Sequence, residues 1–119
     1  MTNPTGLPYT PSLRVGDWVI VSGQIGMVDG GLVRGGFEDE LRVALSNVAS
    51  RLAEHGASMA QVVKTTVFLH HMTDYGEMNR LYAEAFPDEP RPARSAVAVG
   101  ELPLGAMVEI EAWAYLDER

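Results

Sequence analysis

The chain has 119 residues, of which 46% are hydrophobic and 21% charged, a globular composition that excludes a disordered or fibrous protein and predicts one domain over 1–119. It has no cysteine, which excludes disulfides, thiolate metal ligands and a cysteine nucleophile. Sixteen acidic against nine basic residues give a net charge of −7 at pH 7, which argues against nucleic acid as a partner.

The N-terminal part of the chain predicts a β-hairpin followed by a second tight turn. The run at 17–23 is rich in β-branched and aromatic residues, and it follows Leu13 to Val15 across Gly16 and Asp17. A glycine at this point favours a short hairpin connection. The cluster Asp29-Gly30-Gly31 is typical of another tight turn.

The segment 37–55 predicts an amphipathic helix. Three acidic residues at 38–40 fall in its first turn, where the helix dipole favours negative charge, and Gly56 is placed to end it. The apolar residues that recur at helical spacing are Phe37, Leu41, Ala44, Leu45, Val48 and Leu52.

The β-branched run at 62–70 predicts a strand, and a second helix is expected after it. Thr73 and Asp74 are candidate N-caps for that helix, and Pro87 is placed to stop it. The expected apolar stripe of the helix consists of Met78, Leu81, Tyr82 and Ala85.

Two strands at 95–99 and 107–116 complete the predicted order of two strands, helix, strand, helix and two strands. This order favours an α+β fold in which two helices pack on one face of a mixed β-sheet. The opposite face of the sheet is then left without helices.

The last predicted strand has two faces of different character. Alternation places Val108, Ile110, Ala112, Ala114 and Leu116 on the helix-covered side. The other side carries Met107, Glu109, Glu111, Trp113 and Tyr115. Large apolar groups mixed with two carboxylates suit neither open water nor a protein core, so we expect partner subunits to cover this face.

No run of residues approaches the 18 or so apolar positions of a membrane span, and the N-terminal segment lacks the basic and apolar regions of a leader. We therefore expect a cytoplasmic protein with no membrane partner. The adjacent pair His70 and His71 does not predict a metal site, because neighbours in a strand point to opposite faces. No GxxxxGK phosphate loop follows a strand, and no cofactor is expected.

Several motifs resemble the RidA/YjgF family of reactive-intermediate deaminases. The segment 92–95 reads PARS, Leu102-Pro103 follows it, and 108–112 reads VEIEA. The segments 21–25 (VSGQI) and 63–67 (VKTTV) resemble the family's early and middle strands, and the likeness extends from about Tyr9 to Leu116. The resemblance implies a chorismate-mutase-like α+β fold and a homotrimer with three ligand clefts between subunits. The implied reaction is the hydrolysis of 2-imino acids, the tautomers of enamines such as 2-aminoacrylate and 2-aminocrotonate, to 2-keto acids and ammonia.

The same resemblance implies the residues of the site. Arg94 would bind the carboxylate of the substrate, since a guanidinium fork matches a carboxylate with two hydrogen bonds. Glu109 would handle the water and the proton, with its pKa raised by burial and lowered by Arg94, so that the net direction stays open. The other substrate-binding positions implied by the family are Tyr9, Ser22, Gly23, Asn79 and Ala96, the last an alanine where cysteine is frequent.

Other interpretations remain open at this point. Arg94 could instead be a structural interface arginine paired with Glu109 or Glu111. The protein could be a trimer that binds small carboxylates without turnover, or a family member recruited to a particular biosynthetic pathway. The endoribonuclease role sometimes attached to the family is disfavoured, because the chain is acidic and has no basic stripe.

Overall fold

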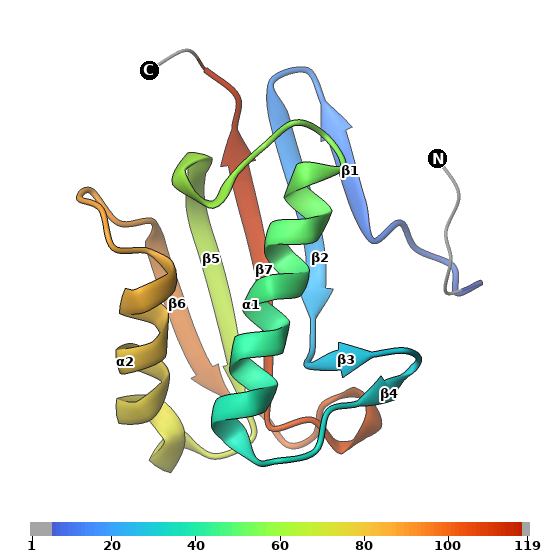
Figure 1. The fold of residues 1–119 in the computed structure, drawn as a ribbon, viewed down its shortest axis with the longest axis vertical. Helices are drawn as coiled ribbons and strands as arrows, with labels where there is room; N and C mark the ends of the chain where they lie inside the picture. The colour runs from blue at the N-terminus through green and yellow to red at the C-terminus, as the bar shows by residue number, and fades with distance from the viewer. Residues whose placement is uncertain (1–5, 118–119) are drawn as a thin grey trace.

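The computed structural model describes residues 6–117, which form a five-stranded sheet with two helices on one of its faces (Figure 1). The strands of this sheet are β1 (Ser12–Val15), β2 (Trp18–Gln24), β5 (Val62–Leu69), β6 (Ala93–Ala98) and β7 (Val108–Tyr115). The helices are α1 (Phe37–Ala53) and α2 (Tyr75–Ala85). The strand order is β1-β2-β7-β5-β6, in which β5 and β6 run parallel and the other neighbouring pairs run antiparallel. The predicted α+β class and mixed sheet are confirmed.

The predicted N-terminal hairpin is formed by β1 and β2, whose ladder ends with Val15 opposite Trp18. Gly16 in the turn between them has a φ of 59°, a conformation that glycine adopts without strain. The predicted turn at 29–31 is also present. It joins two short strands that the sequence did not predict, β3 (Met27–Val28) and β4 (Gly31–Leu32), which form a hairpin beside α1.

Helix α1 packs on the sheet through the predicted stripe. Leu41, Ala44, Val48 and Leu52 are completely buried against β2 and β7. The helix ends at Ala53, two residues before the predicted end. At its first turn the buried Glu40 accepts a 2.8 Å hydrogen bond from the backbone N–H of Met107, which ties the start of β7 to the helix.

Helix α2 follows a 3₁₀ turn at Met72–Asp74 and ends before Pro87, as predicted. Asp74 occupies the N-cap position, but its side chain makes no capping hydrogen bond, so the predicted cap is wrong in its mechanism. The buried face of α2 consists of Met78, Leu81 and Tyr82.

Strand β7 has the two predicted faces. Val108, Ile110, Ala112 and Ala114 are completely buried beneath the helices, whereas Trp113 is 41% exposed on the opposite side. We call that opposite side of the sheet the open face; its side chains include Leu13, Val15, Trp18, Ile20, Lys64, Thr66, Phe68, Glu109, Glu111, Trp113 and Tyr115. Three of its aromatic rings are in contact, with centroids 6.1 Å apart for Trp18 and Trp113 and 5.0 Å apart for Trp18 and Tyr115. Neither helix in the described part of the chain has the length and apolar character of a membrane span.

Candidate active site

Arg94 lies inside the edge strand β6, which begins two residues earlier than predicted. Its partner across the parallel ladder is Thr65 of β5, a completely buried residue beneath the helices. Because paired residues of neighbouring strands point to the same face, the Arg94 side chain extends toward α2 rather than into the open face.

The guanidinium of Arg94 is held between two tyrosines of α2. Its Nη2 donates a 3.1 Å hydrogen bond to the Tyr75 hydroxyl, and its Nη1 lies 3.5 Å from the Met78 sulfur. The guanidinium carbon Cζ lies 4.9 Å from the ring centroid of Tyr82 and 5.6 Å from that of Tyr75, within the range of cation–π attraction. Within residues 6–117 no carboxylate forms an ion pair with Arg94.

The Tyr82 ring is itself held in place by a hydrogen bond in the core. Its hydroxyl shares a 2.8 Å hydrogen bond with the hydroxyl of the buried Thr65, and burial raises the pKa of Tyr82. The stacking surface beneath Arg94 is therefore anchored in the core. Within one chain, Tyr75 and Tyr82 are the neighbours of the guanidinium, and the alternative of a structural interface arginine paired with Glu109 or Glu111 stays a prediction.

A hollow of about 310 Å³ opens beside this arginine. It is lined by Asn79, Tyr82, Ala83, Arg91, Pro92 and Arg94, so two of the predicted site residues, Asn79 and Arg94, come together there. Ala96 lies two residues farther along the same side of β6 and is half-buried. We call Tyr75, Asn79, Tyr82, Arg94 and Ala96 the arginine half-site.

Glu109 lies on the open face of β7, over the backbone of the neighbouring strand β2. A side chain at Gly23 would bring its Cβ to 2.5 Å from the carboxylate oxygen Oε2 of Glu109, so glycine is required for this close approach. A register shift between Val21 and Gln24 marks a bulge in β2 at the same place. Burial raises the pKa of Glu109, and the nearby carboxylate of Glu111 raises it further.

Of the other predicted residues, Ser22 directly precedes Gly23 in β2, and Tyr9 lies in the segment before β1. The Ser22 hydroxyl donates a 2.8 Å hydrogen bond to the backbone carbonyl of Thr10, and its backbone N–H donates to that of Pro11. These bonds fasten the segment that carries Tyr9, which is 46% exposed, alongside β2. We call Ser22, Gly23 and Glu109 the glutamate half-site.

The two half-sites lie on opposite faces of one sheet. Strand β5 separates β6 from β7; its Thr65 pairs with Arg94, whereas its Phe68 pairs with Glu109. Thr65 and Phe68 are three residues apart in an alternating strand, so they point to opposite faces. Within one chain, Arg94 accordingly does not lower the pKa of Glu109. The sequence left the direction of that pKa shift open, and in the structure the pKa is raised.

Sequence reasoning missed Tyr75 as part of the site. The signal that could have found it is its spacing, since Tyr75, Asn79 and Tyr82 fall at i, i+4 and i+7 on one face of a helix. The face of α2 that carries these residues is turned toward the edge strand.

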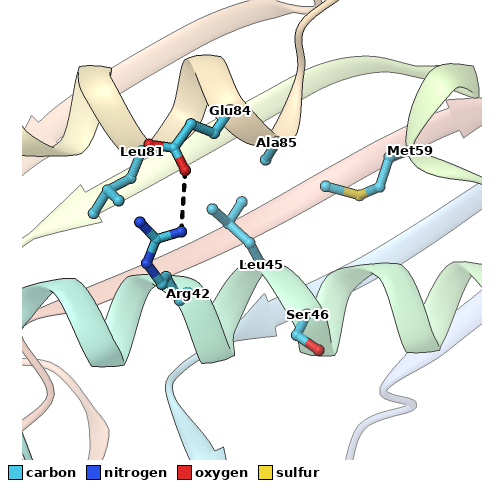
Figure 2. Close-up of a pocket in the computed structure, with 7 residues that line it drawn as sticks. All are labelled: Arg42, Leu45, Ser46, Met59, Leu81, Glu84 and Ala85. Carbon is cyan, nitrogen blue, oxygen red and sulfur yellow. Dashed lines mark hydrogen bonds and ion pairs between the residues drawn. The ribbon is translucent and has the colours of Figure 1, made fainter.

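Another hollow, of about 380 Å³, lies between α1 and α2 away from both half-sites (Figure 2). Its charged side chains Arg42 and Glu84 pair with each other at 3.1 Å, and its other lining residues include Leu45 and Leu81. This ion pair and the apolar contacts beside it join the two helices.

The rings of His70 and His71 lie 4.1 Å apart, and within residues 6–117 no three metal-ligating side chains are grouped together.

Comparisons with known proteins identify relatives along nearly the whole chain. The sequence model of a family described as endoribonuclease L-PSP matches residues 2–116. A 2-iminobutanoate/2-iminopropanoate deaminase of Mus musculus is 41% identical over 109 residues, which cover 90% of this chain and 80% of the mouse protein. The mitochondrial protein mmf2 of Schizosaccharomyces pombe is 38% identical over 109 residues, 89% of this chain and 86% of the relative. The crystal structure of yeast Mmf1 superposes with a TM-score of 0.90 at 34% identity, covering 97% of this chain and 92% of that one. Because one of these relatives is mitochondrial, the cytoplasmic location stays a prediction.

Proposed function

Because the chain belongs to the endoribonuclease L-PSP family, also called RidA/YjgF, we propose that it hydrolyses small 2-imino acids to 2-keto acids and ammonia. The proposed reaction is the one for which the relatives at about 40% identity are named. The residues proposed to carry it out are those of the two half-sites.

The observation that carries the proposal is the separation of Arg94 and Glu109 on opposite faces of one sheet. Neither half-site alone has both a cationic clamp and a carboxyl group. A second copy of the chain, with its open face laid against the edge strand β6, would bring its own Glu109 to the Arg94 of the first copy. The catalytic cleft is thus proposed to lie between subunits of a homotrimer, each cleft using one half-site from each neighbour.

Arg94 is proposed to bind the substrate carboxylate. Its guanidinium plane is fixed by Tyr75 and by the anchored ring of Tyr82, so little freedom is lost when a carboxylate binds. Two parallel charge-assisted hydrogen bonds would then fix C2 of the imine relative to Arg94.

Glu109 is proposed to move the proton. Water attacks C2 while the carboxylate of Glu109 takes one of its protons and passes it to the imine nitrogen, so that a carbinolamine forms. The carboxylate then takes the proton of the new hydroxyl and passes it to the same nitrogen, the C–N bond breaks, ammonia leaves and C2 becomes a carbonyl. A raised pKa suits this exchange, since proton transfer is most efficient when the pKa of the group approaches the working pH.

The name of the family raises RNA cleavage as a second function, and the charge of this chain disfavours it. The net charge is −7, and the open face carries two carboxylates near the candidate site. Phosphate backbones are bound by clusters of Lys and Arg, whose place is taken here by acidic groups.

The activity can be measured with 2-iminobutanoate generated from threonine by a pyridoxal-phosphate dehydratase. We expect ammonia release faster than hydrolysis by buffer, in proportion to the amount of this chain. Arg94→Ala should abolish the excess rate, and Arg94→Lys should recover little of it because an ammonium cannot reproduce the planar fork.

Arg80→Ala is the matched control, because it removes an exposed arginine of α2 that pairs only with Glu38 and Glu84 among the described residues. It should keep the wild-type rate. A wild-type chain that binds 2-oxobutanoate but gives no excess rate would make the protein a carboxylate binder instead of a deaminase.

A further inference from the structure

Tyr75 is the first residue of α2 and is 40% exposed beside the arginine half-site. Its hydroxyl oxygen accepts the hydrogen bond from Nη2 of Arg94. A phenol that accepts a hydrogen bond still has one O–H to donate, whereas a guanidinium can only donate. The Tyr75 hydroxyl therefore adds a donor at a place where the guanidinium presents its own donors.

The two tyrosines that flank Arg94 differ in this respect. The Tyr82 hydroxyl is committed to the buried hydroxyl of Thr65 in the core. The Tyr75 hydroxyl lies on the guanidinium itself and on the exposed part of the half-site. Of these two hydroxyls, that of Tyr75 is the one placed to donate to a group bound by the guanidinium.

We propose that Tyr75 is a second carboxylate-binding residue, whose O–H donates to the same substrate carboxylate that the Arg94 fork binds. This inference rests on the proposed function and names a ligand contact that the family resemblance did not imply. A carboxylate accepts at about four lone-pair sites, so it can take the two bonds of the fork and a third from the phenol. The bond from Nη2 to the phenol oxygen keeps the two donors together and polarises the O–H toward the anion.

The test compares Tyr75→Phe with the wild-type protein in the binding of 2-oxobutanoate, measured by titration calorimetry at constant ionic strength. The variant keeps the ring and its stacking on the guanidinium and loses only the hydroxyl. Because a hydrogen bond to a charged group is lost, we expect the Kd to rise about 10- to 100-fold. Tyr115→Phe is the matched control, since it removes a phenol hydroxyl on the open face beside Trp18 and should leave the Kd unchanged.

A kinetic measurement separates carboxylate binding from a merely structural role. The carboxylate is bound equally in the ground state and the transition state, so Tyr75→Phe should raise KM for the imine and leave kcat nearly unchanged. Its melting temperature and oligomeric state should match those of the wild-type protein.

Three results would overturn the inference. An unchanged Kd in Tyr75→Phe would show that the hydroxyl does not touch the ligand. Tighter binding would show that it competes with the carboxylate for Nη2. If the wild-type protein binds no 2-oxobutanoate, the proposed function fails as well, which distinguishes that outcome from the first two.

Discussion

Arg94 and Glu109 are prepared for different tasks by what surrounds each of them. Arg94 is flanked by tyrosine rings and a thioether, none of which neutralises its charge. It therefore retains its attraction for an anion while its orientation is fixed. The surroundings of Glu109 act in the opposite way, because burial and the carboxylate of Glu111 both disfavour its negative charge and raise its pKa. Each residue lacks what the other would supply.

Replacement of Glu109 by glutamine separates binding from proton transfer. Glu109→Gln keeps the shape of the side chain and loses its ability to exchange a proton, so the single-turnover rate should fall about 10²- to 10⁴-fold. The Kd for 2-oxobutanoate should change far less, because Arg94 remains. If rate and affinity fall together, Glu109 instead holds the arginine of the neighbouring subunit in place.

Glu111 should set the pH at which Glu109 works. Its negative charge raises the pKa of Glu109, so Glu111→Gln should lower that pKa. If Glu109 acts in its ionised form, the rate falls as the pH drops through this pKa. The acid limb of kcat/KM against pH should accordingly move to lower pH in the variant. If the acid limb of the pH profile does not move in the variant, a group other than Glu109 is responsible for that limb.

At the scale of elements, the bulge in β2 positions the glutamate half-site. It interrupts the ladder with β7 between Val21 and Gln24 and places the Cα of Gly23 under the Glu109 carboxylate. The site therefore depends on a strand that carries no proposed proton-transfer group of its own.

Gly23→Ala tests that dependence. Its Cβ would collide with the end of the Glu109 side chain, which is flexible and can be displaced. We expect the fold to remain, as judged by circular dichroism, and the deaminase rate to fall as the carboxyl group moves. Gly100→Ala is the control, since a Cβ there meets no atom within 4 Å. Wild-type turnover in Gly23→Ala would mean that Glu109 need not lie against β2.

The sequence predicted elements well where periodicity carries the information. The stripe of α1 and the alternation of β7 are strong patterns, and the predicted buried residues Leu41, Ala44, Val48 and Leu52 of α1 and Val108, Ile110, Ala112 and Ala114 of β7 are buried. The short strands β3 and β4 were missed because two residues do not make a periodic pattern. The position of Arg94 relative to Glu109 could not be predicted from the sequence either, because it depends on the strand order, in which β5 lies between β6 and β7.

The whole molecule leaves its open face without cover from its own helices. Trp18 and Trp113 are each about two-fifths exposed there, 40% and 41%, in a surface that also carries Phe68 and the Glu109 carboxylate. Such a surface is typical of an interface between subunits. The trimer remains a proposal, supported by this face and by the divided site.

Sedimentation of Trp113→Lys tests the interface. The wild-type chain should sediment as a trimer at micromolar concentration, and a lysine ammonium in the centre of the apolar contact should dissociate it. Because Trp113 is partly exposed within one chain, the variant should keep its secondary structure. A wild-type monomer, or a trimer in the variant as stable as the wild type, would place the interface elsewhere.

The central claim is that each catalytic cleft takes Arg94 from one subunit and Glu109 from its neighbour, and mixing two inactive variants tests it most directly. Arg94→Ala and Glu109→Gln chains are unfolded together, refolded at equal concentrations and assayed for imine hydrolysis beside each variant refolded alone. Random assembly of a cyclic trimer leaves about a quarter of the clefts with both native residues, so about a quarter of wild-type activity should return. If both residues served one cleft from the same subunit, every cleft would lack one of them, and the mixture would be as inactive as its components.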